Sequence, residues 1–254
     1  MRTWLFWLAG LLALPLSAAP ADGLAAGQAA YAAGDFVGAV EKWQAEVTAR
    51  GATAGLLAAL GNAEWKLGRK GRAMLCWERA LLLDPRDPVA TAGLRHAQSA
   101  GGAERPALTW AENYASFLGA DTWLILATVS FWVVLLGLLV PRLRRRAPTE
   151  WQEKAIVAGA TLFILTLPAL WGAHVYARRA VVRQADVFLR LTPTARGESI
   201  GGVAEGDIVR TDRPFGDYVR VTTAAGQTGW LQRREIETLW GGGLPADLDR
   251  KAAP

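Results

Sequence analysis

The chain has 254 residues, a formal net charge of +5 and 52% hydrophobic residues, which is enough for two small domains together with membrane segments. The net positive charge does not indicate nucleic-acid binding, because the excess of Lys and Arg flanks the hydrophobic runs: residues 141–183 carry eight Lys or Arg and two acidic residues, and Arg2 adds one more positive charge. A single cysteine, Cys76, excludes a disulfide framework within the chain. We expect Cys76 to be a small buried residue, with a reactive or lipidated thiol as the alternative.

The first 21 residues have the pattern of a secretory signal peptide. Arg2 gives a short positive start, residues 4–16 are an apolar run too short to cross a bilayer as a helix, and small residues follow in SAAPA at 17–21. We expect cleavage after Ala21, with an uncleaved interfacial anchor as the alternative.

Residues 22–98 repeat at an offset of 34, which is the tetratricopeptide period. The pairs at this offset include Gly27/Gly61, Ala29/Ala63, Gly34/Gly68, Ala39/Ala73 and Trp43/Trp77. We therefore expect two helical hairpins, at about 20–53 and 54–87, in which small residues let antiparallel helices approach and tryptophans fill the space beside them. A capping helix is predicted at roughly 88–98, with Asp87 as its N-cap and Pro88 at its first position.

The second copy of the repeat, residues 60–85, resembles the tetratricopeptide consensus in Leu60-Gly61, Gly68, Ala73, Trp77, Ala80 and Pro85. This resemblance implies a groove that binds peptides along the first helix of each repeat. The matching positions here are Gln28, Tyr31, Asn62, Trp65 and Lys66. Asn62 can hydrogen-bond a peptide backbone and Lys66 can pair with a carboxylate, whereas the alternative is a solvated Lys66 and a packed Trp65.

Two uncharged apolar runs predict a membrane hairpin. After a linker at 99–121, the expected transmembrane helices are residues 122–140 and 155–176. The loop between them, 141–154, has five Lys or Arg, whereas the 15 residues before the first span have none. We expect this basic loop to be cytoplasmic and both soluble domains to lie on the periplasmic side of a bacterial inner (cytoplasmic) membrane.

From Ala185 onward the pattern changes to short β-rich runs separated by glycine and proline turns. The expected strands are 185–191, 207–211, 217–222 and 228–232, which suit a small closed or half-closed barrel. Residues 184–240 resemble the bacterial SH3-like (SH3b) domain in YVRV at 218–221 and GQTGWL at 226–231. The resemblance implies a ligand surface at Tyr218 and Trp230, although Trp230 equally suits the core. Residues 241–254 are predicted to be disordered.

The sequence thus predicts a multidomain membrane protein with all-α tetratricopeptide repeats, two transmembrane helices and a small all-β SH3-like barrel. In this combination it resembles the BatE family, the tetratricopeptide member of the Bat (aerotolerance) group. Related proteins of that group carry von Willebrand factor A domains and are associated with MoxR-type ATPases. The resemblance implies a membrane-anchored scaffold for stress or aerotolerance, with membrane proteins that carry von Willebrand factor A domains as partners.

An enzyme is not expected, because the chain has two His, one Cys and no HExxH, GxSxG, CxxC or phosphate-loop motif. We likewise expect no metal site and no cofactor. The alternative function is a cell-wall receptor that binds peptidoglycan through the SH3-like domain.

Overall fold

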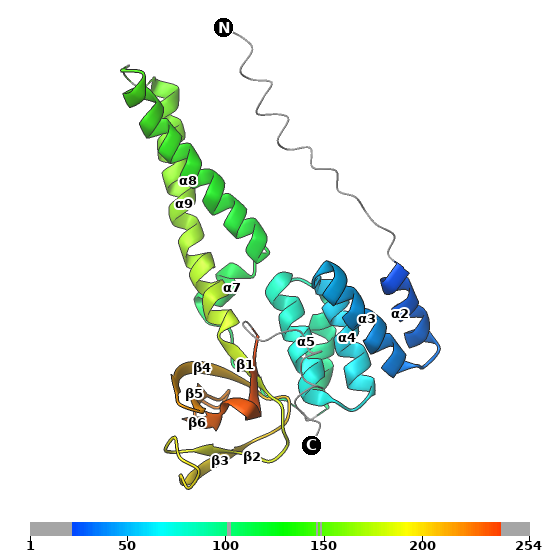
Figure 1. Cartoon of the computed structure of the whole chain (residues 1–254). Coiled ribbons are helices and arrows are strands. Elements are labelled where there is room, and N and C mark those ends of the chain that lie inside the picture. Colours follow the sequence, from blue (N-terminus) through cyan, green and yellow to red (C-terminus); the bar gives the residue numbers. More distant parts are fainter. Residues whose placement is uncertain (1–21, 101–102, 146, 148, 240–254) are drawn as a thin grey trace.

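The computed structural model describes residues 22–100, 103–145, 147 and 149–239. The predicted signal peptide at 1–21 and the predicted disordered tail at 241–254 lie outside these residues. A group of short helices, a long helical hairpin and an antiparallel sheet follow one another along the chain (Figure 1). The short helices and the sheet both lie at the end of the hairpin opposite its connecting turn, so the two globular parts are on the same side.

The N-terminal part, which we call the helical module, consists of two helical hairpins and one further helix. Its elements are α2 (Asp22–Ala32), α3 (Phe36–Arg50), α4 (Ala54–Lys66), α5 (Lys70–Leu83) and α6 (Pro88–Ser99). Both hairpin turns contain a glycine with positive φ, 81° at Gly34 and 75° at Gly68, a conformation that side chains with a Cβ rarely adopt. The predicted start of α6 is confirmed, because the Asp87 carboxylate accepts a hydrogen bond from the Ala90 amide at 2.8 Å.

The same contact between glycine and tryptophan occurs in both hairpins of the helical module. A Cβ on Gly27 would lie 2.3 Å from Nε1 of Trp43, and a Cβ on Gly61 would lie 2.5 Å from Nε1 of Trp77. No larger residue fits at either glycine without moving a buried ring. The predicted pairing of small residues with large ones is therefore present at both positions.

Cys76 lies in the core of the helical module and its side chain is fully buried. Burial raises the pKa of its thiol to about 12. The thiol is therefore neutral at physiological pH, as the prediction of a small buried residue requires.

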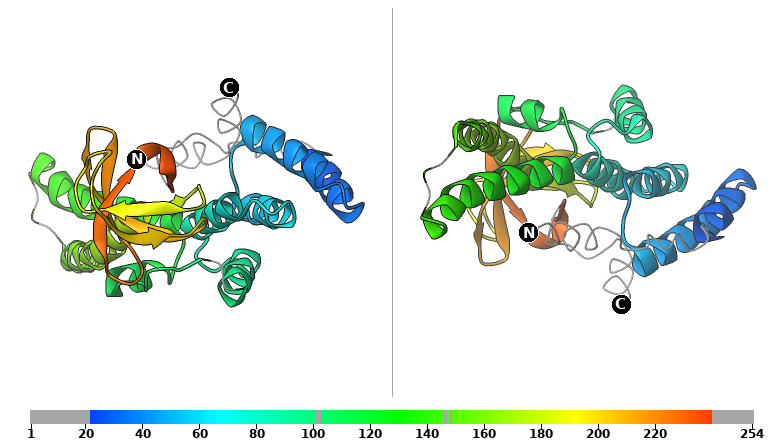
Figure 2. Two further views of the ribbon diagram at one scale, coloured as in Figure 1. Left: turned by 90° about the horizontal axis from the view of Figure 1, so that it is seen from below. Right: turned by 90° about the horizontal axis from the view of Figure 1, so that it is seen from above.

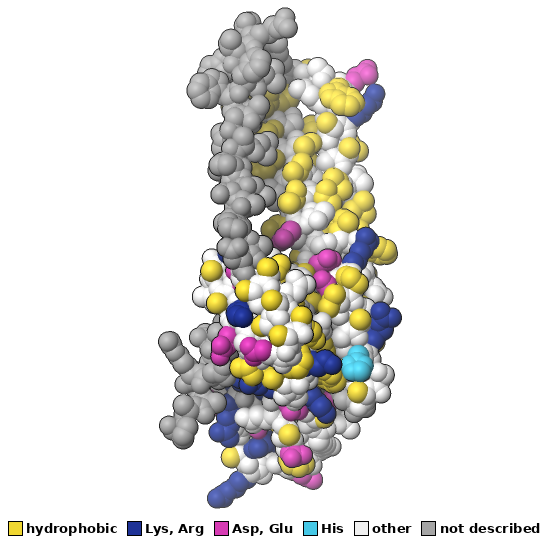
Figure 3. All heavy atoms as spheres, turned by 90° about the vertical axis from the view of Figure 1, so that its right-hand side faces the viewer, with side chains coloured by type: hydrophobic (Ala, Val, Ile, Leu, Met, Phe, Trp, Pro, Cys, Tyr) yellow, Lys and Arg dark blue, Asp and Glu magenta, His cyan; other side chains and the backbone are white. Residues whose placement is uncertain are grey.

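The long hairpin consists of α8 (Ala120–Leu143) and α9 (Glu150–Ala177), and both helices are long and apolar enough to cross a membrane. They extend beyond the predicted spans at 122–140 and 155–176, so the connection between them is shorter than the predicted loop at 141–154. Pro141 lies inside the last turn of α8 and does not end it, and Thr149 caps α9 together with Gln152. On the face of the hairpin that is visible in Figure 3, hydrophobic side chains are spread along its length, whereas charged ones lie at its tip and over the globular parts.

Within the segment predicted as a linker, 99–121, residues 103–109 pack against the sheet, and we call them the ordered segment. Glu104 pairs with the sheet, because its amide donates to Asp207 at 2.7 Å and its carbonyl accepts from the Ile208 amide at 2.9 Å. A short helix, α7 (Trp110–Ala115), follows and packs on α9. A Cβ on Gly172 of α9 would lie 2.0 Å from the Ala111 carbonyl oxygen, so this close approach depends on the glycine.

As far as Leu239, the last residue described, the C-terminal part is a sheet of seven strands in which every pairing is antiparallel, in the order β3-β2-β6-β5-β4-β1-β7. The strands are β1 (Arg179–Val182), β2 (Val187–Arg190), β3 (Ser199–Val203), β4 (Ile208–Phe215), β5 (Tyr218–Thr222), β6 (Thr228–Gln232) and β7 (Ile236–Thr238). The predicted domain start at 184 is too late, because β1 follows α9 after the single residue Arg178. The runs at 217–222 and 228–232 were predicted to within one residue, and β1, β3 and β7 were not predicted.

The sheet and the helical module share a core along β1. Successive residues of a strand point to opposite faces. Ala180 and Val182 pack inside the sheet, whereas Val181 packs with Ile208 and Leu239 against the helical module. The sheet therefore lies beside α5, with α2 and α3 farther out (Figure 2).

Candidate functional site

An open groove of about 470 Å³ lies on the helical module. It is lined by Tyr31, Asn62, Trp65, Lys66 and Trp77, and by Pro88, Val89, Ala92, Gly93 and His96 of α6. The structure thus brings together four of the five predicted groove residues. The fifth, Gln28, is exposed and does not line the groove.

The two hairpins differ at the aligned positions Gln28 and Asn62. The indole nitrogen of Trp77 donates to Oδ1 of Asn62 at 3.1 Å, which fixes the Asn62 side chain in the groove. The indole nitrogen of Trp43 instead donates to the Leu24 carbonyl oxygen at 3.2 Å. The internal repeat therefore aligns Gln28 with Asn62, but within the described residues Gln28 has no equivalent hydrogen bond from a tryptophan.

The groove offers three kinds of contact to a ligand. Trp65 is half-buried, with its ring centroid 5.7 Å from both Trp77 and His96, and forms an aromatic surface. Lys66 is exposed and supplies a positive charge. Asn62 uses its oxygen for Trp77, and its amide nitrogen carries two hydrogens that can be donated to a peptide carbonyl.

The contribution of α6 to the groove was not predicted. A Cβ on Gly93 would lie 2.3 Å from Cε2 of Trp77, so α6 packs directly on the Trp77 ring and carries His96 and Ala92 to the groove. The available sequence signal was a glycine inside a predicted helix, which often marks close packing.

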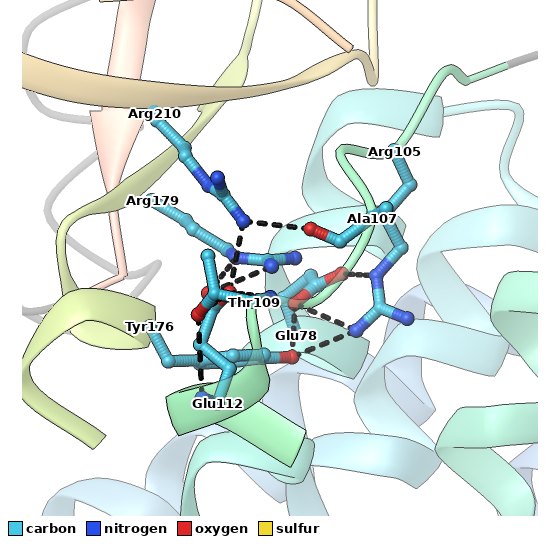
Figure 4. Close-up of polar contacts among 8 residues, drawn as sticks. All are labelled: Glu78, Arg105, Ala107, Thr109, Glu112, Tyr176, Arg179 and Arg210. Carbon is cyan, nitrogen blue, oxygen red and sulfur yellow. Dashed lines mark hydrogen bonds and ion pairs between the residues drawn. The ribbon is translucent and has the colours of Figure 1, made fainter. Parts of the chain in front are cut away.

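Three clusters of buried ion pairs join the helical module, the hairpin and the sheet, and we call them the junction. Figure 4 shows the two clusters around Glu112 and Glu78. The first involves Glu112 of α7, whose side chain is fully buried. Its Oε1 accepts from Nε and Nη2 of Arg179 at 3.0 and 2.7 Å, and its Oε2 accepts from Nη2 of Arg210 at 2.8 Å. The amide and hydroxyl of Thr109 also donate to Oε2, at 2.6 and 2.8 Å. The carboxylate therefore ties α7 to two strands of the sheet.

The second ion pair involves the fully buried Glu78 of α5. Nε of Arg105 lies 2.5 Å from its Oε1, and the Tyr176 hydroxyl donates to its Oε2. Nη2 of Arg105 also donates to the Tyr176 hydroxyl at 2.9 Å. This cluster joins the helical module to the ordered segment and to the last turn of α9.

A third contact joins α5 to the end of the sheet. Nη2 of Arg79 lies 3.1 Å from Oε1 of Glu237, and the same guanidinium donates to the carbonyl oxygens of Thr238 and Leu239. Together, the three clusters hold the two globular parts and the base of the hairpin in one arrangement. None was predicted, because the partners lie far apart in sequence, for example 67 residues between Glu112 and Arg179.

Burial alone would raise the pKa of Glu112, but the hydrogen bonds from Thr109 and the charge of Arg179 outweigh it and hold this pKa below the ordinary 4.5. A carboxyl group whose pKa is depressed in the folded state stabilises the fold at pH values above its ordinary pKa. This stabilisation is lost as the pH falls through the folded-state pKa. For Arg105, burial lowers the pKa, but Glu78 outweighs it, so the net pKa is raised.

We expect the free energy of unfolding to fall as pH drops below 4.5, by about 1.4 kcal/mol for each unit by which the pKa of Glu112 is depressed. Denaturant unfolding of the full chain in detergent micelles, from pH 6 to pH 3, measures this. Glu112→Gln removes the titrating group and should show a smaller decline. An equal decline in both proteins would mean that Glu112 does not contribute to the acid sensitivity.

The predicted ligand residues of the sheet lie on an aromatic patch formed by Phe215, Tyr218 and Trp230. Tyr218 and Trp230 are half-buried on the adjacent strands β5 and β6, so Trp230 is neither a core residue nor fully exposed. Phe215 is 62% exposed, and the centroid of its ring lies 6.2 Å from that of Trp230. The Arg190 guanidinium carbon lies 6.0 Å from the centroid of the Tyr218 ring, which places a cation beside the patch.

No protein-family model, curated protein or solved structure matches this chain. Within the described residues, no group of three or more His, Cys, Asp or Glu side chains is placed to hold a metal ion. The groove and the aromatic patch are the two surfaces at which predicted site residues come together.

Proposed function

We propose that the protein is a non-enzymatic, membrane-anchored scaffold of the bacterial cell envelope that binds a segment of a partner protein in the groove of the helical module. The observation that carries this proposal is the convergence of Tyr31, Asn62, Trp65 and Lys66 on one open groove. In this proposal the two helical hairpins are tetratricopeptide repeats, the first helices of which line such grooves.

The proposed orientation places the tip of the hairpin in the cytoplasm and both globular parts on the periplasmic side. Arg142, Arg144 and Arg145 lie near the tip and favour the cytoplasmic side. The position of both globular parts at the other end of the hairpin supports a common location for them. The SH3-like identity of the sheet belongs to the same proposal.

The proposed partners are membrane proteins with von Willebrand factor A domains, within a complex that includes a MoxR-type ATPase and is linked to stress or aerotolerance. This choice of partner rests on the resemblance to the BatE family. The junction supports a scaffold role, because it fixes the groove relative to the base of the hairpin and hence to the membrane.

The groove favours a partner segment with a carboxylate and an aromatic or aliphatic side chain. The carboxylate would pair with Lys66 and the apolar side chain would lie on Trp65. A backbone carbonyl would accept a hydrogen bond from the Asn62 amide nitrogen. Asn62 is not a suitable residue to mutate, because its loss would leave the indole nitrogen of the buried Trp77 without an acceptor.

Lys66→Glu is expected to reduce capture of the partner by about tenfold, because it replaces the attractive charge in the groove with a repulsive one. Lys42→Glu is the matched control, because Lys42 is exposed on α3 and does not line the groove. Affinity capture from native membranes, with quantitative mass spectrometry of von Willebrand factor A proteins, measures both variants. Equal recovery with Lys66→Glu and Lys42→Glu would count against the groove.

The second candidate function is peptidoglycan binding through the aromatic patch. The observation in its favour is the exposed Phe215 beside Trp230 and Tyr218, because exposed aromatic rings are common in binding surfaces. Recovery of no partner protein in the same capture experiment, together with retention of the full-length protein on cell-wall sacculi in a sedimentation assay, would favour this candidate. In the sacculus assay, Phe215→Ala tests the aromatic patch. Phe188→Ala is its control, because Phe188 on β2 is also exposed.

A further inference from the structure

A second pocket, with a volume of about 230 Å³, lies between the helical module and the base of the hairpin. We call it the interfacial pocket. Its walls are mainly apolar and include Leu81, Leu82, Leu94, Leu108, Ala115 and Trp123. These residues come from α5, α6, the ordered segment, α7 and α8, so the pocket exists only because the globular part is held against the hairpin.

The hairpin residues of the pocket place it at one membrane surface. Ala120 and Trp123 lie in the first turn of α8, and Ala173 and Tyr176 lie near the end of α9. At the same end of the hairpin, Trp110 and Trp171 are 73% and 64% exposed. Exposed tryptophans favour the level of the lipid headgroups. A hairpin that crosses the membrane therefore sets this pocket beside the headgroups and the first methylenes of the outer leaflet.

Among the charged residues that line the interfacial pocket and their direct ion-pair partners, positive charges outnumber negative ones. Arg95 and Arg105 line it, as does the Glu112 carboxylate, which Arg179 and Arg210 already neutralise. Glu78 neutralises Arg105. These four arginines and two glutamates leave two positive charges, so the pocket favours an anionic group.

We infer that the interfacial pocket binds an anionic phospholipid of the outer leaflet, with part of one acyl chain inside and the phosphate near Arg95. Apolar cavities of about 150 Å³ admit a benzene molecule. The volume of about 230 Å³ therefore accommodates a section of a hydrocarbon chain but not a whole lipid. Basic pockets beside transmembrane helices bind lipid headgroups through the same charge complementarity. The inference rests on the proposed membrane placement and is independent of the groove.

The test uses the full-length protein in detergent micelles, with phosphatidylglycerol or zwitterionic phosphatidylethanolamine added, and native mass spectrometry to count retained lipids. The wild type is expected to retain one phosphatidylglycerol in preference to phosphatidylethanolamine. Arg95→Gln should lower the retention of phosphatidylglycerol by about fivefold, the contribution of one arginine near an anionic lipid.

Filling the pocket supplies the second variant. Ala173→Phe adds a ring to the pocket wall, and Ala158→Phe makes the same change at an exposed position of the same helix. We expect Ala173→Phe to abolish retention of the lipid and Ala158→Phe to leave it unchanged. Carbonate extraction of each variant from membranes shows separately whether the hairpin inserts.

Three results would overturn the inference in a protein that inserts normally. One is the retention of no lipid by the wild type. Another is equal retention of phosphatidylglycerol and phosphatidylethanolamine. The third is equal retention by Ala173→Phe and Ala158→Phe, which would place the lipid elsewhere on the hairpin.

Discussion

Replacing Glu112 with Gln is expected to lower the free energy of unfolding by about 3–5 kcal/mol, because it leaves the buried Arg179 guanidinium without its carboxylate. Arg179 is 0% exposed, so water cannot take the place of the lost partner. Nη1 of Arg179 and Nε of Arg210 already lack a hydrogen-bond acceptor within the described part of the chain. The site therefore has no spare acceptor with which to compensate.

Glu104→Gln is the matched control for this prediction. Glu104 is exposed and lies in the same ordered segment, and it contacts the sheet through its backbone. Denaturant unfolding of both variants in the same detergent compares them directly. The segment at 103–109 should also become sensitive to protease in Glu112→Gln and not in Glu104→Gln. Equal stability of the two variants would show that the Glu112 ion pairs do not hold the junction.

Trp77→Ala is expected to cost about 3–5 kcal/mol of unfolding free energy, the usual effect of removing a large buried aromatic side chain. Its ring packs on Gly61 of α4 and Gly93 of α6, and its nitrogen donates to Asn62. The substitution would leave a cavity between three helices and an amide oxygen without its donor. The groove depends on this ring, so partner capture should fall as well.

Trp151→Ala removes a tryptophan that is 78% exposed and provides the control. We expect it to change the unfolding free energy by no more than about 0.5 kcal/mol, as is usual for surface positions. Thermal and denaturant unfolding, followed by far-ultraviolet circular dichroism, measure both variants. A loss of less than about 1 kcal/mol in Trp77→Ala would mean that the helical module repacks around the cavity.

The parts of the fold that could be predicted from the sequence are those with a local periodic signal. The offset of 34 between Trp43 and Trp77 predicted the paired helices, because each large ring needs a small residue opposite it. The two long helices could be predicted from the length of the two uncharged apolar runs. The run at 228–232 could be predicted because its residues alternate between more and less buried positions. The run at 217–222 could be predicted because it lies beside clear turn residues.

Strand β1 was missed because it has no alternating pattern. Ala180, Val181 and Val182 are all buried, since one face of the strand lies in the sheet and the other on the helical module. Next to the apolar hairpin, such a run cannot be told apart from the end of a membrane helix by periodicity. Helix α7 was missed because it has only six residues, although Thr109 and Glu112 form a capping box that could have indicated its start.

The contact between the two globular parts could not be predicted at all. It depends on Val181, Ile208 and Leu239 packing with the helical module and on the Arg79–Glu237 ion pair. In the sequence, each of these residues has the pattern of an ordinary strand residue or of a surface charge. Only the folded chain brings them together, which is also why Glu112 was not among the predicted site residues.

The proposed scaffold function is tested most directly by photo-crosslinking from the groove in native membranes. A photoreactive amino acid replaces Lys66 in one protein and Lys42 in the other, and mass spectrometry identifies what each one captures. We expect membrane proteins with von Willebrand factor A domains to be crosslinked from position 66 and not from position 42. Equal crosslinking from both positions, or none from position 66, would contradict the proposal that the groove binds a partner protein.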